Sequence, residues 1–222
     1  VPQLTDRGHE VIGTCRSPHK AEQLRALGAE PVVLDALDAR AVREAVKGAE
    51  PDAVIHQATA LANVRLGRNL DRTFAPTNRL RTEGTDNLLA AAQDASVRRF
   101  VAQSFASLRY ARGGGMVKSE EDPLDPDPLA KTRETNAAMR HLDQAVTDAG
   151  GIALRYGGFY GASNDGVVGP VRKRQFPIVG DGGGFSSFVH LDDAAAATVL
   201  ALEHDGPAIY NIVDDEPAPL RE

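Results

Sequence analysis

The sequence has no tryptophan, few aromatic residues (5%) and one cysteine, Cys15. One cysteine cannot form an internal disulfide, which excludes a disulfide-stapled secreted domain. No uninterrupted apolar run approaches the ~20 residues that a membrane-spanning helix needs. Basic residues are also fewer than acidic ones, with 25 Lys+Arg against 31 Asp+Glu. The net charge of −6 therefore provides no positive electrostatic field to bind the phosphate backbone of a nucleic acid. We therefore expect no nucleic-acid partner, no membrane partner and a cytoplasmic location.

The composition is that of a globular protein, because 42% of the 222 residues are hydrophobic and 25% are charged. Such a length favours one domain with a small additional lobe. The first residues read as the end of a helix, with Gly8 as its stop, and neither an initiator Met nor a signal peptide precedes them. The last residues end where a new helix could begin. We therefore expect the chain to be a fragment.

Short β-branched runs alternate with segments of helical periodicity from Gly8 to Tyr156. Strands are expected at residues 9–15, 31–34, 53–57, 99–102 and 152–156, and helices at residues 21–28, 38–48, 83–92 and 133–149. Asp38 is a good N-cap for the second helix. This alternation predicts the α/β class, with a Rossmann-like, doubly wound parallel sheet covered by helices on both faces.

The pattern changes after Tyr156. Glycine and proline become frequent in residues 157–184, followed by a helix at 193–203 and a strand at 209–213. We expect an NAD(P)-binding domain in residues 1–156 and a small substrate-binding lobe in residues 157–222, over the sheet edge where ligands bind in such folds. The acidic, proline-punctuated residues 119–128 predict a solvated loop.

Six short motifs occur in an order typical of one known family. They are Arg-Ser-Pro (16–18), Asp-Ala-Leu-Asp (35–38), Glu-Gly-Thr-Asp-Asn-Leu-Leu (83–89), Ala-Leu-Arg-Tyr-Gly-Gly-Phe-Tyr-Gly (153–161), Phe-Val-His-Leu-Asp-Asp (188–193) and Tyr-Asn-Ile (210–212). The chain thereby resembles the extended and atypical short-chain dehydrogenases/reductases, the NAD(P)-dependent epimerase/dehydratase family. The resemblance covers nearly the whole chain. It implies a nicotinamide cofactor and a small-molecule substrate.

Several elements of the family pattern are absent. The family's first strand and glycine-rich phosphate turn would precede this chain, and the glycine triplets at 113–115 and 182–184 are interpreted as flexible loops because neither joins a strand to a helix. Lys131 stands where the family has its catalytic Tyr, and Thr135 where it has the Lys that lowers the pKa of that Tyr. Arg81 stands where the family usually has Asn. Catalysis through the usual Tyr–Lys pair is therefore not expected.

The resemblance places other side chains at the catalytic edge. Ser107 falls where the family has its active-site Ser/Thr, and Tyr110 is a candidate substitute proton donor, with a packing role as the alternative. Tyr160 falls in the part of the family that lines the substrate cleft. We expect Tyr160 to shape the pocket and Ser107 and Tyr110 to carry the chemistry.

The end of the first expected strand favours NADP(H) over NAD(H). NAD users place a carboxylate there for the ribose 2′-hydroxyl, whereas this chain has Arg16, which can bind a 2′-phosphate through its guanidinium. A solvated surface charge is the alternative for Arg16. By the resemblance Asp35 lies at the adenine amino group, and the expected cofactor-binding set is Arg16, Ser17, Asp35, Ala36, His56, Ala58 and Gln103.

The remaining chemistry-bearing residues favour structural roles. Cys15 lies in an apolar strand and is interpreted as a small core residue. His190 is expected to be packed and hydrogen-bonded, while Asp192 and Asp193 are expected to cap the helix that follows. No spacing of His, Cys, Asp and Glu suggests a metal site.

The sequence supports two functions of different classes. The first is an NADP(H)-dependent oxidoreductase or epimerase/dehydratase-like enzyme acting on a small polar or sugar-like substrate. The second is an NADP(H)-binding regulator without turnover, which the missing Tyr–Lys pair favours. A scaffold that has lost its cofactor is a third possibility, against which the regions of Arg16 and Asp35 argue.

Overall fold

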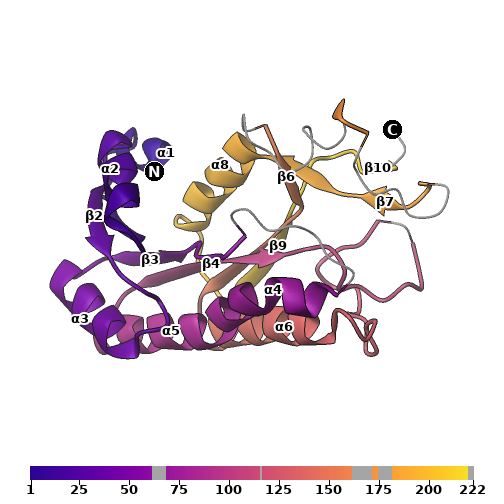
Figure 1. The fold of residues 1–222 in the computed structure, drawn as a ribbon, viewed down its shortest axis with the longest axis horizontal. Helices are drawn as coiled ribbons and strands as arrows, with labels where there is room; N and C mark the ends of the chain where they lie inside the picture. Colours follow the sequence, from indigo (N-terminus) through magenta and orange to yellow (C-terminus); the bar gives the residue numbers. More distant parts are fainter. Residues whose placement is uncertain (62–68, 116, 162–171, 175–181, 220–222) are drawn as a thin grey trace.

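A computed structural model describes residues 1–61, 69–115, 117–161, 172–174 and 182–219 (Figure 1). The first half contains α1 (Pro2–Thr5), β1 (Ile12–Cys15), α2 (Pro18–Ala26), β2 (Glu30–Val33), α3 (Ala39–Ala49), β3 (Ala53–His56), α4 (Leu70–Arg79), the π-helix η1 (Leu80–Gly84) and α5 (Thr85–Asp94). The second half contains β4 (Arg99–Phe105), α6 (Arg133–Asp148), β5 (Ile152–Tyr156), β6 (Gly158–Tyr160), β7 (Phe185–Ser186), β8 (Phe188–His190), α8 (Leu191–Ala201), β9 (Ala208–Ile212) and β10 (Ala218–Pro219).

The strands of the core are all parallel, as the alternation of strands and helices predicts. They pair in the order β3-β4-β5-β9, and β1 and β2 form a separate parallel pair. Within the described residues no hydrogen-bonded strand joins these two parallel groups. The α/β class and the parallel direction are confirmed.

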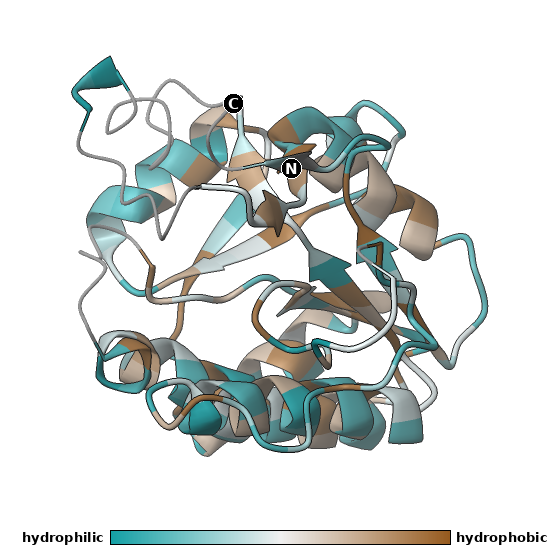
Figure 2. Ribbon diagram, turned by 90° about the vertical axis from the view of Figure 1, so that its right-hand side faces the viewer, coloured by the Kyte–Doolittle hydropathy of each residue, from teal (hydrophilic) through white to brown (hydrophobic). Residues whose placement is uncertain are grey.

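Helices cover both faces of the four-stranded sheet. In Figure 1 α3, α4, α5 and α6 lie below it and α8 lies above it. The lower core contains Phe100, Ala102, Leu142, Val146 and Ala153, and the upper core contains Val101, Leu154, Tyr156, Val189 and Ala194. Figure 2 shows hydrophilic and hydrophobic residues alternating along the lower helices. The two cores follow from the period of two in the strands, which sends alternate side chains to opposite faces.

The region after residue 156 contributes to the main sheet as well as to its edge. β9 pairs with β5, and α8 packs on the upper face. β6 and β8 form a further parallel pair, and β7 pairs with β10 in antiparallel direction. The division at residue 156 stays a prediction. The glycine- and proline-rich residues 157–184 lie partly outside the described residues.

One helical stretch was not predicted. α4, η1 and α5 follow one another without interruption, whereas the sequence pattern indicated a helix only from Glu83. Pro76 and the polar residues beside it disfavour a helix in this stretch. In the structure α4 packs against α6, and Asn78 in α4 donates a hydrogen bond to Thr135 in α6 at 3.1 Å.

The loop of residues 119–128 follows the prediction. It contains no helix or strand and most of its residues are exposed, but backbone hydrogen bonds hold it in place. The amide of Asp125 donates to the carbonyl oxygen of Arg109 at 2.7 Å, and that of Ala111 donates to Pro123 at 2.9 Å. The loop is thereby fixed beside the carboxyl end of β4.

The N-cap of α8 differs from the expectation. His190 Nδ1 accepts a hydrogen bond from the amide of Asp192 at 3.2 Å, while Asp192 and Asp193 lie exposed in the first turn. The expectation that an aspartate caps this helix is therefore wrong, because the helix begins at Leu191, two residues earlier than predicted. The expectation of a packed, hydrogen-bonded His190 is confirmed.

Replacing His190 by alanine is expected to lower the free energy of unfolding by about 1 kcal/mol, the usual contribution of an N-cap side chain. Asp192→Ala serves as the matched control and should change the stability much less, since its carboxylate accepts no amide of the helix. Urea denaturation of both variants measures the difference. A larger loss in Asp192→Ala than in His190→Ala would contradict this assignment of the cap.

Candidate active site

Polar side chains replace apolar ones on the α6 side of the sheet where three neighbouring strands approach their carboxyl ends. Each polar residue lies two positions after an apolar one and therefore on the same face of its strand. The pairs are Ala102 and Ser104 in β4, Ala153 and Arg155 in β5, and Ile209 and Asn211 in β9. The register places Ser104 beside Arg155 and Arg155 beside Asn211. In open parallel sheets ligands bind at this edge. The three residues therefore form a polar row at the expected position of an active site.

A buried ion-pair network joins this row to α6. Asp143 of α6 is 4% exposed, and its Oδ2 accepts from Arg155 Nε at 2.9 Å and from the guanidinium of Arg109. Arg109 is 1% exposed and also donates to Ser104 Oγ at 3.0 Å. Because a buried carboxylate requires a counter-charge, each of these groups depends on the others. The network fixes the carboxyl ends of β4 and β5 against α6.

Tyr110 connects the network to β9. Its hydroxyl donates to Asn211 Oδ1 at 2.7 Å and accepts from Arg155 Nη1 at 3.0 Å. The Arg155 guanidinium also lies 5.8 Å from the centre of the Tyr110 ring. A guanidinium that donates to a phenol oxygen stabilises negative charge on that oxygen. Tyr110 is thus a half-buried phenol held by a cation at the carboxyl edge.

The other predicted residues of β4 lie on or just after the strand. Gln103 is half-buried in β4, and Ser107 is half-buried in the turn that follows. Since Tyr110 comes three residues after Ser107, the two share this loop. The structure therefore brings Ser107 and Tyr110 to the same end of the sheet.

Lys131 and Thr135, the residues expected at the positions of the family's Tyr–Lys pair, lie at the start of α6. Lys131 is exposed and precedes α6, which begins at Arg133. Thr135 is 3% exposed, and its hydroxyl donates to Asp71 Oδ1 at 2.8 Å and accepts from Asn78 at 3.1 Å. Asp71 also accepts from the amide of Thr135 at 2.8 Å and so caps α6 from α4. Thr135 therefore has a structural role, and unlike a lysine it carries no charge.

Arg81 is a further buried cation at this edge. It is 8% exposed, in η1, and burial lowers its pKa to about 10, with Arg109 adding to the decrease and Asp143 opposing it. Its guanidinium remains protonated at neutral pH. Among the residues that the structure describes, Arg81 makes no side-chain hydrogen bond and no ion pair within 4.0 Å.

The residues expected at the nucleotide end lie at the carboxyl ends of β1 and β2. Arg16 is exposed directly after β1 and makes no hydrogen bond or ion pair within the described part of the chain, and Ser17 begins α2 without a side-chain cap bond. Asp35 follows β2, and its Oδ1 accepts from the amide of Leu37 at 3.0 Å. Ala36 is half-buried, and its carbonyl oxygen accepts from Asn87 at 3.0 Å. An accessible cation, Arg16, and a carboxylate, Asp35, thus stand at the carboxyl ends of two neighbouring strands.

His56 ends β3 with both ring nitrogens engaged. The residue is 3% exposed, with Nε2 at 3.3 Å from the carbonyl oxygen of Leu80 and Nδ1 accepting from the amide of Ala58 at 3.4 Å. Burial lowers the pKa of His56 to about 4, and the charge of Arg81 contributes. The imidazole is therefore neutral at neutral pH, and both of its ring nitrogens contact the backbone of the protein. Ala58 itself is exposed.

Tyr160 lies against the cap of α8. Its ring meets His190 edge-on, with ring centres 5.2 Å apart, and a hydrogen bond to Asp214 raises the pKa of its hydroxyl. Gly161 follows with φ +101°, and a side chain there would meet His190 Nε2 at 2.0 Å, so only glycine fits. Tyr160 is thus held at the end of β6, beside β8.

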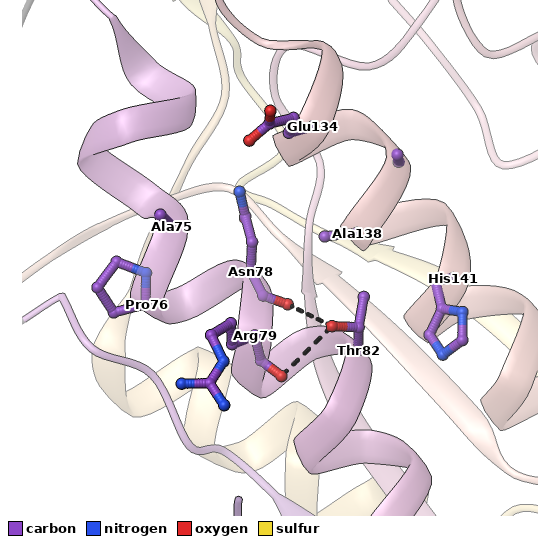
Figure 3. Close-up of a pocket in the computed structure, with 9 residues that line it drawn as sticks. Ala75, Pro76, Asn78, Arg79, Thr82, Glu134, Ala138 and His141 are labelled. Atoms are coloured by element: carbon purple, nitrogen blue, oxygen red, sulfur yellow. Dashed lines mark hydrogen bonds between the residues drawn. The ribbon is translucent and has the colours of Figure 1, made fainter.

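A groove of about 710 Å³ lies elsewhere, between α4 with η1 and α6 (Figure 3). It is lined by Ala75, Pro76, Asn78, Arg79, Thr82, Glu134, Ala137, Ala138 and His141. In Figure 3 the Thr82 hydroxyl bonds to the carbonyl oxygens of Asn78 and Arg79 and so does not point into the groove as a free donor. No predicted site residue lines this groove.

The described residues contain no group of three or more His, Cys, Asp or Glu placed to hold a metal ion, and no helix among them is long and apolar enough to cross a membrane.

The sequence analysis missed Asp143, Arg155 and Asn211. A signal was present for Arg155, because an arginine between Leu154 and Tyr156 is unusual in a strand predicted to be buried. Asp143 carried a similar signal, since it follows Leu142 on the apolar face of its helix. Asn211 has no such signal in the sequence.

The comparison with family models is decisive for the fold and the cofactor class. The model of the NAD dependent epimerase/dehydratase family matches residues 1–213. The chain belongs to this family. It is therefore an NAD(P)-dependent enzyme of the oxidoreductase or epimerase type, and the predicted family and Rossmann-like fold are confirmed.

Curated relatives of this epimerase/dehydratase family member include reductases. A 3-diazoavenalumate denitrifying reductase of Streptomyces sp is 40% identical over 231 residues, covering 100% of this chain and 73% of the relative. A 4-hydroxy-2-methyl-3-oxo-4-farnesyl-3,4-dihydroquinoline-1-oxide ketoreductase of Stigmatella aurantiaca is 28% identical, covering 98% of this chain and 65% of the relative.

Solved structures share the fold at lower identity. The UDP-glucose 4-epimerase of Thermotoga maritima, solved with UDP-glucose, has a TM-score of 0.78 at 21% identity and covers 99% of this chain and 74% of its own. A dTDP-glucose 4,6-dehydratase of Streptomyces venezuelae, solved with NAD bound, has a TM-score of 0.75 at 21% identity. The match covers 99% of this chain and 73% of the dehydratase chain. These similarities support the architecture of the sheet.

Proposed function

We propose that this protein is an NADP(H)-dependent reductase of a small polar carbonyl compound. The observation that carries the proposal is the Arg155–Tyr110 pair, a proton donor held by a cation at the carboxyl edge of a chain that lacks the family's Tyr–Lys pair. The names of the two curated relatives favour reduction over epimerisation. The names of these relatives refer to small-molecule substrates. A sugar-like substrate is the alternative, and activity assays with sugar substrates beside simple ketones test it.

The cofactor would be held by the residues expected from the sequence. Arg16 and Ser17 would bind the 2′-phosphate, and Asp35 and Ala36 would face the adenine. Ala58 and the backbone of His56 would line the path along β3 toward Gln103. When bound, NADPH supplies a hydride to the substrate.

The chain's own groups would then complete a carbonyl reduction. The Ser107 hydroxyl donates a hydrogen bond to the carbonyl oxygen and orients it. Tyr110 gives its hydroxyl proton to that oxygen as the alcohol forms, and Arg155 stabilises the phenolate that remains until solvent reprotonates it. For this step the Tyr110 hydroxyl must turn from Asn211 toward the substrate. Tyr160 would shape the pocket without donating a proton.

Replacing Arg16 by alanine is expected to weaken NADP⁺ binding by about 10- to 100-fold, since hydrogen bonds to a charged group contribute about 1.5–3 kcal/mol. NAD⁺ binding should change little, because NAD⁺ has no 2′-phosphate. Titration calorimetry of the full-length protein with both nucleotides measures the two affinities.

Arg25→Ala is the matched control for this experiment. Arg25 lies in the next helix, α2, is exposed, and pairs with Glu22. Tighter binding of NAD⁺ than of NADP⁺ by the unchanged protein, or unchanged NADP⁺ affinity in Arg16→Ala, would overturn the cofactor preference.

A further inference from the structure

The buried network at the carboxyl edge contains more positive than negative charge. Arg81, Arg109 and Arg155 are 8%, 1% and 4% exposed, and Asp143 is the buried carboxylate to which their charges are coupled. Arg109 and Arg155 both pair with Asp143, so this carboxylate is already shared by two guanidinium groups and the charge of Arg81 is left over. A buried charge without a counter-charge is unfavourable by several kcal/mol, on the order of the stability of a small domain.

The three arginines differ in what they bind. Arg155 donates to Asp143 and Tyr110, and Arg109 donates to Asp143 and Ser104. Arg81 donates to none of them, and in the described part of the chain its guanidinium has no hydrogen-bond acceptor. Arg81 is thus the member of the cluster whose guanidinium has no acceptor at all among the described residues, while Arg155 and Arg109 hold the protein together through the bonds named above and only Nε of Arg109 lacks a partner.

Arg81 lies between the end of β3 and α6. The carbonyl oxygen of Leu80, its neighbour in η1, is 3.3 Å from His56 Nε2 at the end of β3, and η1 packs against α6. The charge of Arg81 accordingly lowers the pKa of His56. Arg16, the cation proposed for the cofactor 2′-phosphate, lies at the end of β1, in the other sheet. The two cations are therefore at different parts of the edge and do not serve one phosphate group.

We propose that Arg81 binds a carboxylate of the substrate, so that the reductase acts on anionic carbonyl compounds in preference to neutral ones. The proposal rests on the proposed function and narrows its substrate class. A guanidinium is suited to this task because its planar donors match the two oxygens of a carboxylate. The bound carboxylate supplies the negative charge that the cluster lacks, with Asp143 retained by its two other arginines.

Benzoate and its neutral analogue benzamide test the site in the full-length protein saturated with NADP⁺. Benzoate is expected to raise the melting temperature of the unchanged protein and benzamide is not. Arg81→Met, which keeps the length of the side chain and removes the charge, is expected to weaken benzoate binding at least about 10-fold. Arg79→Met is the matched control and should bind benzoate normally, because Arg79 is exposed and pairs with Glu83.

The stability of the free protein provides a second measurement. Arg81→Met should melt at the same temperature as the unchanged protein or higher, since replacing an uncompensated buried ion by an apolar side chain is often neutral or stabilising. Equal benzoate binding by Arg81→Met and the unchanged protein would overturn the proposal. So would stabilisation by inorganic phosphate but not by benzoate, or a loss of folding in both Arg81→Met and Arg81→Lys.

Different results would refute the reductase proposal and the carboxylate-site proposal. Absence of NADPH oxidation with any ketone, while benzoate binding still depends on Arg81, would refute the reductase and leave the carboxylate site. Reduction of neutral and anionic ketones at equal kcat/KM would refute the carboxylate site and leave the reductase.

Discussion

Replacing Asp143 by alanine is expected to lower the free energy of unfolding by about 3–5 kcal/mol, the effect of removing one partner from a buried ion pair. The change leaves Arg109 and Arg155 buried without their shared acceptor, beside Arg81, so positive charges face one another. Urea denaturation followed by circular dichroism measures the loss.

Asp148→Ala is the control, because Asp148 is an exposed aspartate on the same helix whose side chain accepts only from Gln144. It should change the stability by less than about 0.5 kcal/mol, as most exposed substitutions do. Similar stabilities of the two variants would contradict a structural role for the network.

Replacing Tyr110 by phenylalanine is expected to lower kcat by at least about 10²-fold, the lower end for a positioned proton donor. The ring stays in place, so KM for the ketone should change much less than kcat. Removing the hydroxyl also leaves Arg155 and Asn211 without one partner each, which predicts a loss of stability of about 1–2 kcal/mol. Steady-state kinetics at saturating NADPH, at a temperature where both proteins are folded, separates the two effects.

Lys131→Ala is the corresponding control. Lys131 is exposed and lies before α6, so most of the activity should remain. The reverse pattern, with little effect at Tyr110 and a large loss at Lys131, would return the chemistry to the start of α6.

Periodicity and capping residues were sufficient to predict most elements of the fold. The helix that begins after Asp38 is an example, since the Asp38 side chain accepts from the amides of Arg40 and Ala41 at 3.1 and 3.0 Å. Local signals failed where tertiary packing overrides propensity, as in α4 with Pro76 inside it. They also failed at α8, where His190 takes the capping position that the aspartates were expected to fill.

The site was predictable in part. Motif order placed Arg16 and Asp35 at the ends of two strands, and Ser107 and Tyr110 after a third, and the structure has them there. The partners of Tyr110 could not be predicted, because Arg155 and Asn211 come from strands 45 and 101 positions away along the chain. Their adjacency depends on the pairing of β4, β5 and β9, which local patterns do not specify.

The number of NADPH molecules oxidised during turnover of a carbonyl substrate by the full-length protein tests directly whether the protein is a reductase. A reductase consumes one NADPH for each alcohol formed, and we expect this ratio, with NADPH bound at least about 10-fold more tightly than NADH. Conversion of substrate with no net oxidation of NADPH, as in an epimerase that restores its cofactor in each cycle, would refute the reductase.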